Sequence, residues 1–215
     1  MTGSELREQL VHFARRMITS GLVRGTSGNL STREPGGAHA LVTPSGVDYD
    51  TMTPSDVVLV DLHGNPVSSG LKPSVDTPIH VAIYRARPDV GAVIHTHSLY
   101  AAAFSALARE IPPLITESAG YLGGAVRVIP YVPPAQPDTG VVVAKGLAGE
   151  RAVLLPNHGV IAVGENLQKA FGAAMAVEES AHVAYLAMQL GNPMLVPESE
   201  IARMNEFIHH RYGQH

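Results

Sequence analysis

The sequence predicts an α/β fold in which short buried strands alternate with longer amphipathic helices. Uncharged runs rich in β-branched residues, such as 90–94 and 160–163, are typical of buried strands. Segments with apolar residues every three or four positions, such as 5–20 and 166–190, are typical of helices. No internal repeat or linker divides the chain, so we expect one domain over residues 1–215.

Composition narrows the classes of function. The chain has 215 residues and a net charge of −4, which gives no reason to expect nucleic acid or an anionic membrane as a partner. It has no cysteine, so any metal ion must be held by histidine, aspartate or glutamate. Its first residues lack the basic start and apolar core of a signal peptide. We therefore expect a cytoplasmic protein.

The N-terminal third is expected to begin with a helix from Glu5 to about Ser20, which Ser4 can cap. Loops of glycine and small polar residues follow at 24–31 and 44–46. Their backbone N–H groups and hydroxyls could meet an anion. The expected strands and turn of this part are 40–43, 57–61 and an exposed turn at His63.

A helix is expected from Thr77 to Arg87, with Asp76 at its N-cap and Pro78 in its first turn. Its N-terminal dipole would favour an anion beside Ser74. His80 lies one turn from Asp76, where it could orient the carboxylate or fill space, and we expect it to fill space. The elements expected further on are helices at 99–108, 139–149, 166–190 and 198–210 and strands at 126–129, 152–155 and 160–163, with an extended segment at 111–120.

Two histidines, His95 and His97, follow the apolar run 90–94. In a strand, His95 and His97 point to the same side, about 6–7 Å apart along the chain, and two such rings can converge on one ion. Spacing alone favours two hydrogen-bonded structural histidines. His158 stands beside Gly159 in a break between apolar runs, which suits close approach to a bound group. Three histidines around a divalent ion with an open position are typical of a catalytic site.

Five motifs in this order resemble the class II aldolase/epimerase superfamily of L-fuculose-1-phosphate aldolase and L-ribulose-5-phosphate 4-epimerase. The motifs are Gly25-Thr-Ser-Gly28-Asn29-Leu-Ser31, Leu41-Val-Thr-Pro-Ser45-Gly46, Lys72-Pro-Ser74-Val75-Asp76-Thr-Pro-Ile-His80, Ala92-Val-Ile-His95-Thr-His97 and Asn157-His158-Gly159. The resemblance covers nearly the whole chain. It implies the class II aldolase fold, a central and mostly antiparallel sheet with helices on both faces. It also implies a homotetramer with sites at subunit interfaces.

The resemblance implies a Zn²⁺ ion, or another divalent metal such as Mn²⁺ or Co²⁺, on His95, His97 and His158, with the carboxylate of Asp76 beside it. In the aldolase the corresponding acid is a glutamate that acts as acid/base, whereas in the epimerase it is an aspartate ligand. The shorter side chain favours ligation. The residues implied for the substrate phosphate are Gly28, Asn29, Ser45, Gly46 and Ser74; a second family serine is replaced by Val75.

Several further positions separate the branches of the family. Gly120 stands near the catalytic aspartate of the epimerase, which argues against epimerisation, and Tyr212-Gly213 matches a C-terminal pair of the aldolase. Thr116 stands close to a tyrosine of the fuculose enzyme. Glu117 is either a replacement acid/base or an ordinary loop glutamate.

The expected function is a zinc-dependent lyase of the aldolase branch. It would cleave a ketose 1-phosphate resembling L-fuculose 1-phosphate by a retro-aldol reaction to dihydroxyacetone phosphate and an aldehyde, with Asp76, Glu117 and Tyr212 as catalytic candidates. An alternative on the same scaffold is a 5-deoxyribulose- or methylthioribulose-1-phosphate aldolase or dehydratase, or a phosphosugar-acid decarboxylase. A 4-epimerase and a non-catalytic zinc-binding oligomerisation module are the remaining alternatives. A phosphosugar is the expected small-molecule partner.

Overall fold

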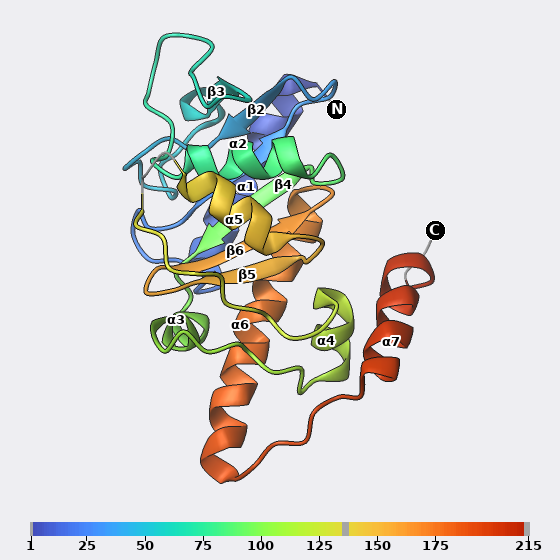
Figure 1. The fold of residues 1–215 in the computed structure, drawn as a ribbon. Coiled ribbons are helices and arrows are strands. Elements are labelled where there is room, and N and C mark those ends of the chain that lie inside the picture. Colours follow the sequence, from blue (N-terminus) through green and yellow to red (C-terminus); the bar gives the residue numbers. More distant parts are fainter. Residues whose placement is uncertain (1, 135–137, 213–215) are drawn as a thin grey trace.

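The computed structural model describes residues 2–134 and 138–212. Its centre is one open sheet of six strands in the order β3-β2-β1-β4-β6-β5, and every neighbouring pair is antiparallel (Figure 1). The strands are β1 (Asn29–Arg33), β2 (His39–Val42), β3 (Val58–Asp61), β4 (Ala92–Thr96), β5 (Ala152–Leu155) and β6 (Gly159–Gly164). The helices are α1 (Gly3–Thr19), α2 (Thr77–Ala86), α3 (Leu99–Ala106), α4 (Thr116–Leu122), α5 (Thr139–Leu147), α6 (Leu167–Leu190) and α7 (Glu198–His210), with a 3₁₀ turn at Pro54–Asp56.

Helices cover both faces of the sheet, as expected. Helices α1, α3 and α6 share one buried apolar cluster with strand residues such as Leu30 and Ile94. Helices α2 and α5 share a second cluster with strand residues such as Val93 and Ile161. Because side chains alternate along a strand, His95 lies on the same face as Val93, under α2 and α5. The alternation of side chains along β4 therefore places His95 on the face of the sheet that α2 and α5 cover.

The first helix begins earlier than expected. Its N-cap is Thr2, not Ser4, and the Thr2 hydroxyl accepts from the backbone of Glu5 while the Glu5 carboxylate accepts from the backbone of Thr2. The reason is the spacing of a capping box, which needs Glu or Gln three residues after the cap. Three residues after Ser4 stands Arg7, which instead reaches the carbonyls of Pro54 and Val57.

Two expectations for the segment 111–129 are wrong. Residues 116–122 form helix α4 where an extended segment was expected, because α4 is held by packing between α6 and α7. A Cβ on Gly120 would lie 2.5 Å from Cβ of Met204, so this contact between α4 and α7 requires glycine. Residues 126–129 form only isolated bridges, from Val126 to Ile111 and from Val128 to Leu154, and not the expected strand. Pro112 and Pro113 follow Ile111 and cannot extend the pairing.

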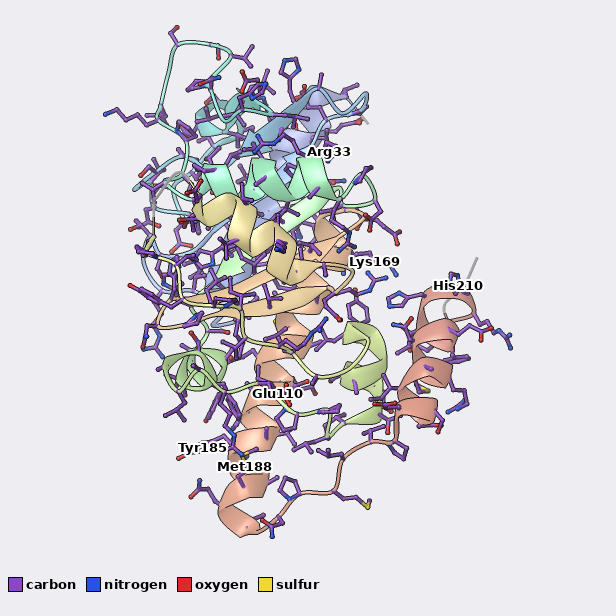
Figure 2. All side chains as sticks on the ribbon, in the orientation of Figure 1. Arg33, Glu110, Lys169, Tyr185, Met188 and His210 are labelled. Carbon is purple, nitrogen blue, oxygen red and sulfur yellow. The ribbon has the colours of Figure 1, made fainter. Side chains whose placement is uncertain are left out.

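The C-terminal half of α6 projects beyond the sheet (Figure 1). Tyr185 and Met188 lie on this projecting part, and Leu186 and Leu190 also expose much of their surface (Figure 2). Tyr185 also contacts Tyr100 and Met188 packs against the core, so Leu186 and Leu190 carry most of the exposed apolar surface. An exposed apolar helix end is typical of a surface that meets another protein. In the described part of the chain, no helix is long and apolar enough to cross a membrane.

Candidate metal centre

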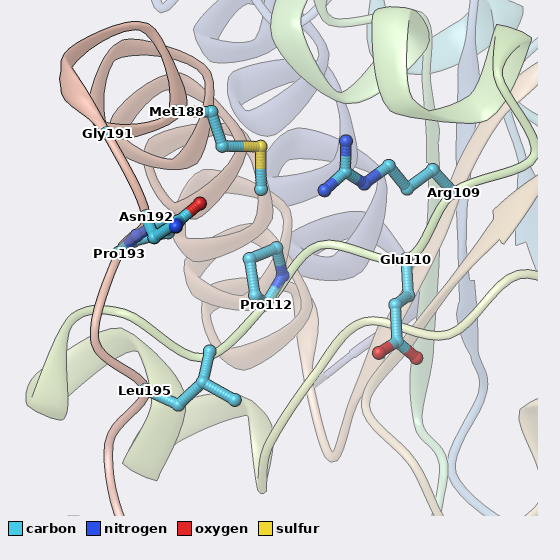
Figure 3. Close-up of a pocket in the computed structure, with 8 residues that line it drawn as sticks. All are labelled: Arg109, Glu110, Pro112, Met188, Gly191, Asn192, Pro193 and Leu195. Carbon is cyan, nitrogen blue, oxygen red and sulfur yellow. The ribbon is translucent and has the colours of Figure 1, made fainter.

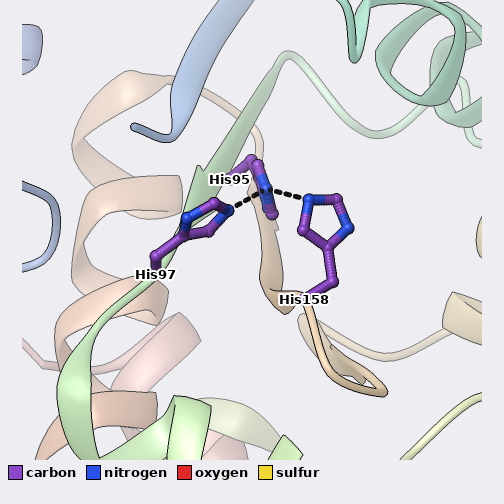
Figure 4. Close-up of side chains that lie close together, drawn as sticks. All are labelled: His95, His97 and His158. Carbon is purple, nitrogen blue, oxygen red and sulfur yellow. Dashed lines mark hydrogen bonds between the residues drawn. The ribbon is translucent and has the colours of Figure 1, made fainter. Parts of the chain in front are cut away.

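Three imidazoles converge at the edge of the sheet where β4 ends. His95 lies within β4, His97 directly follows it, and His158 lies in the turn between β5 and β6 (Figure 4). The Nε2 atom of His95 is 2.9 Å from Nε2 of His97 and 3.2 Å from Nε2 of His158. Bonds of about 2.0–2.1 Å place three nitrogens at such separations around a single zinc ion. The arrangement therefore fits a divalent metal held by three histidines.

The turn that carries His158 differs from its expected form. Strands β5 and β6 pair with each other, so Pro156 to His158 form a hairpin turn and not a break within one strand. Asn157 adopts φ 55, the left-handed region that asparagine tolerates better than most residues. A Cβ on Gly159 would lie 2.2 Å from the carbonyl oxygen of Thr96 and 2.9 Å from Cδ2 of His97. Glycine is therefore what lets this turn approach β4.

His95 is oriented by the backbone of the adjacent strand. Its Nδ1 atom donates to the carbonyl oxygen of Val160 at 2.8 Å, which leaves Nε2 as the free ligand atom. Burial lowers the pKa of His95 to about 3 and also lowers the pKa of His97. Both rings are therefore neutral near pH 7, and a neutral imidazole is the form that binds a metal ion.

Asp76 is the N-cap residue of α2, as expected, but its carboxylate makes no capping hydrogen bond and lies beside the three histidines. Its Oδ2 is 3.8 Å from Nε2 of His95 and accepts a hydrogen bond from Nδ2 of Asn29 at 2.8 Å. Burial raises the pKa of Asp76, but nearby His95 and the Asn29 hydrogen bond outweigh it, so the pKa lies below its ordinary value. The carboxylate is therefore ionised and near enough to reach an ion on the histidines after a small movement.

Glu178 supports the segment next to the metal centre, and no sequence pattern indicated this role. The carboxylate of Glu178 on α6 accepts from the backbone N–H groups of Tyr100 and Ala101, at 3.0 and 2.9 Å. It thereby caps α3, the helix that begins two residues after His97. A half-buried glutamate in a helix rich in alanine is the one signal that could have indicated this role.

Comparison with known proteins agrees with this geometry. Residues 8–185 match the model of the Class II Aldolase and Adducin N-terminal domain. The chain belongs to this family. It is 36% identical over 200 residues to a 5-deoxy-D-ribulose 1-phosphate aldolase of Bacillus thuringiensis serovar kurstaki, covering 92% of each chain. It is 34% identical over 203 residues to the L-fuculose phosphate aldolase of Escherichia coli K12, covering 94% of this chain and 93% of the relative.

The fold agrees as well. A solved structure of an L-fuculose 1-phosphate aldolase superposes with a TM-score of 0.92 at 33% identity, over 97% of this chain and 98% of the other. The class II aldolases are metal-dependent lyases, and this chain is an enzyme of that class. The predicted family, fold and enzyme class are confirmed.

The residues predicted to meet a phosphate surround the start of α2 in this class II aldolase. The segments that carry Ser45 and Ser74 are joined by backbone hydrogen bonds, from Ser45 N to Lys72 O at 2.9 Å and from Ser74 N to Thr43 O at 3.0 Å. The hydroxyl of buried Ser74 accepts from the backbone N–H of Asp76 at 3.3 Å. Asn29, the first residue of β1, bonds Asp76, and Gly28 directly precedes it. The exposed turn at Ser45 and Gly46 belongs to the same region through the hydrogen bond from Ser45 to Lys72.

Glu117 and Tyr212 lie elsewhere in the molecule. Both line a cavity of about 700 Å³ between α4, α6 and α7, together with Tyr121, Met204 and Phe207. Within the described residues, no hydrogen bond or ion pair joins either side chain to the three histidines. Gly213, predicted to act with Tyr212, lies outside the described residues. One subunit therefore does not bring these two candidates to its own histidines.

A smaller cavity of about 390 Å³ lies where α6 ends (Figure 3). Arg109, Glu110 and Pro112 line one side of it, and Met188 and Leu195 line the other. The Arg109 side chain extends toward Met188, while the Glu110 carboxylate is turned away from it (Figure 3). No histidine lines this cavity, so it is separate from the metal centre.

Without metal, the enzyme is expected to lose stability as the pH falls below about 6.5. Burial lowers the pKa of His95 to about 3 and of His80 to about 4, from 6.5 in the unfolded chain. Between these values the unfolded chain binds more protons, so the free energy of unfolding falls by about 1.4 kcal/mol per pH unit for each ring. Urea unfolding of the metal-free protein at several pH values measures this slope. A free energy that is constant between about pH 6.5 and 5 would contradict it.

Proposed function

We propose that the chain is a zinc-dependent aldolase that cleaves a ketose 1-phosphate to dihydroxyacetone phosphate and an aldehyde. The observation that carries this proposal is the convergence of His95, His97 and His158 beside an ionised carboxylate, in a chain that belongs to the class II aldolases. The three histidines would hold the ion and leave positions open for substrate. When bound, the ion supplies Lewis-acid stabilisation of the negative charge that develops beside the ketose carbonyl as the C3–C4 bond breaks.

Asp76 is proposed as a further ligand of the resting site. Its carboxylate is ionised, is 3.8 Å from the ligand atom of His95 and is fixed by Asn29. The short aspartate side chain limits how far the carboxylate can withdraw toward a substrate carbon. In this role Asp76 would add a negative charge beside the ion that the histidines would hold. Glu117 is then the candidate for proton transfer at C3 of the substrate, and Asp76 is the alternative if it does not bind the ion.

The phosphate of the substrate is proposed to lie against Gly28, Asn29, Ser45, Gly46 and Ser74. The support is the position of these residues around the N-terminus of α2, where the helix dipole favours an anion. A phosphate bound there would lie next to Asp76. The C2 carbonyl and C3, which are nearest to the phosphate, would then face the histidines, and the far end of the sugar would extend beyond them. Val75 is exposed beside this turn and offers only its backbone.

Glu117 and Tyr212 are proposed to act on the site of a neighbouring subunit. They share one cavity that is not joined to the histidines of their own chain. In a homotetramer, that cavity would face the histidines of the adjacent copy, and the exposed residues Tyr185 and Leu190 on α6 supply apolar surface for such contacts. Tyr212 would then exchange a proton with the aldehyde-side oxygen, and Glu117 would serve as acid/base.

A second candidate substrate is a 5-deoxy or 5-methylthio pentulose 1-phosphate. The relative of Bacillus thuringiensis serovar kurstaki is named for a 5-deoxy-D-ribulose 1-phosphate, and one of Rhodospirillum rubrum for 5-methylthioribulose and 5-deoxyribulose 1-phosphates. The cavity that Glu117 and Tyr212 line also contains Met175, Met204 and Phe207. Such apolar walls favour a methyl or thioether group over a hydroxyl.

The function is tested with a panel of phosphorylated ketoses before and after removal of metal. We expect dihydroxyacetone phosphate from a ketose 1-phosphate, loss of that product after chelation, and recovery of the activity when zinc is added back. Manganese and cobalt added in parallel identify the ion that restores the highest rate. Loss of water or of carbon dioxide from the substrate would instead assign a dehydratase or a decarboxylase. Cleavage that is unchanged by chelation would exclude the metal mechanism.

A further inference from the structure

A buried hydrogen-bonded group lies between β1 and α2, directly beside the metal centre. The hydroxyl of Ser31 is 2.7 Å from Nδ1 of His80 and 2.7 Å from the phenol oxygen of Tyr84. Ser31, His80 and Tyr84 have side chains that are almost completely inaccessible to solvent. Polar groups this deep in a core persist only where they are bonded to one another or serve a site.

This group is next to the hydrogen bond between Asn29 and Asp76. Asn29 and Ser31 lie on the same face of β1, about 6–7 Å apart along the strand. Asp76 and His80 lie one helical turn apart, where side chains are about 5–6 Å from each other. Two cross-links therefore run side by side from β1 to α2: Asn29 to Asp76 and Ser31 to His80.

Each cross-link leaves one polar atom without a partner in the described structure. These atoms are Nε2 of His80, which is fully buried, and Oδ1 of Asn29. The first is a donor if the ring carries its proton on Nε2, and the second is an acceptor. Burying either atom without a partner costs about 1–3 kcal/mol, so a role for the His80 nitrogen at the adjacent cross-link accounts for its retention.

One direction of donation satisfies both hydrogen bonds of Ser31. Burial raises the pKa of Tyr84 beyond its ordinary range, so its phenol keeps its proton and can donate to Ser31. Ser31, having accepted from Tyr84, has its own proton to donate to Nδ1 of His80. A neutral imidazole that accepts at Nδ1 carries its proton on Nε2. In this arrangement the donors run from Tyr84 through Ser31 to His80, and Nε2 of His80 carries a proton.

We propose that His80 is a positioning residue for Asp76: its Nε2–H is directed at the Asn29–Asp76 pair, and Ser31 and Tyr84 hold it in that orientation. This inference rests on the proposed role of Asp76 as a metal ligand. It revises the expectation that His80 only fills space. Donors behind a ligand commonly change metal affinity by about 10- to 100-fold when they are removed.

The position of the proton is tested first, by nitrogen-15 NMR of the histidine side chains in the metal-free protein. His80 is expected as the tautomer protonated on Nε2, with its assignment made by its loss in His80→Gln. A His80 ring protonated on Nδ1 would overturn the proposed direction, since Nε2 would then be an acceptor facing a carboxylate.

Metal affinity is tested next, by titrating cobalt into the metal-free protein and following its absorption spectrum. We expect the dissociation constant to rise about 10-fold in His80→Phe, which removes the donor, and roughly threefold in Tyr84→Phe, which leaves the ring in place. His80→Gln can accept from Ser31 and donate toward Asp76, so it is expected to stay closer to the wild type than His80→Phe.

The matched control is Ile83→Val, which removes one buried methylene from the same helix without contacting Asp76. It is expected to lower stability and to leave cobalt affinity unchanged. If Tyr84→Phe and His80→Phe bind cobalt like this control while Asp76→Asn binds it weakly, His80 has no positioning role and the proposed ligand set stands. If Asp76→Asn also binds cobalt as tightly as the wild type, the ligand role of Asp76 fails, and the inference fails with it.

Discussion

Replacing His158 by alanine is expected to abolish zinc binding at stoichiometric concentrations and to slow ketose 1-phosphate cleavage at least about a thousandfold. Two histidines remain, but His95 and His97 both come from the end of β4 and leave the side of the site that His158 fills open. Because His158 lies half-buried in a hairpin turn, its loss leaves the core of the sheet intact. Metal content and steady-state rates measure the two effects.

His63→Ala is the matched control, since His63 is an exposed histidine in a turn outside the site. It is expected to keep both zinc and activity. The same His158→Ala protein tests whether sites are shared between subunits: mixed under exchange conditions with an inactive Glu117→Gln/Tyr212→Phe double variant, it is expected to regain activity. Hybrids that stay as inactive as the two parents would show that Glu117 and Tyr212 do not act on the site of a neighbouring subunit. A His158→Ala enzyme with normal zinc content would contradict the three-histidine centre.

Replacing Gly159 by alanine is expected to destabilise the enzyme by about 3 kcal/mol and to weaken metal binding about tenfold. The new methyl group would stand 2.2 Å from the carbonyl oxygen of Thr96 and 2.9 Å from the His97 ring. Relief of that overlap requires β6 to move away from β4, and this movement carries His158 away from His95. Urea unfolding and cobalt titration measure the two consequences separately.

Gly149→Ala provides the comparison for this prediction. A Cβ at Gly149 meets no atom within 4 Å, so the variant is expected to be within about 0.5 kcal/mol of the wild type. If Gly159→Ala were as stable as Gly149→Ala and bound cobalt as well, the close contact between the turn and β4 would have no importance for the site.

The histidine centre was predictable because its residues follow a local rule. His95 and His97 lie two positions apart at the end of a β-branched run, and a strand places such a pair on one side. Their convergence to 2.9 Å, and the contribution of His158, depend on the pairing of β4 with β6 across more than sixty residues. Spacing alone favoured a structural role for His95 and His97. The glycine beside His158 and the resemblance of five motifs were what indicated a metal site shared by all three histidines.

The parts that were not predictable are set by tertiary contacts. Helix α4 is short and contains Gly120, so its own propensity is weak and its packing against Met204 decides its form. Asp76 has the sequence position of an N-cap, yet its carboxylate bonds Asn29. No local pattern reveals that β1 passes beside α2. The roles of Glu117, Tyr212 and the phosphate-binding residues stay predictions.

The position of the three histidines along the chain would make a metal ion bound by them a cross-link. His97 and His158 enclose the segment that includes α3, α4, α5 and β5, so a bound metal closes a long loop of the chain. His158 reaches His95 and His97 only when β4 and β6 pair, so the free energy of binding a metal would add to the free energy of folding. At a free zinc concentration 100 times the dissociation constant, this gain is about 2.7 kcal/mol. A cell that is short of metal would thus lose molecules of this aldolase to unfolding and proteolysis as well as losing their turnover.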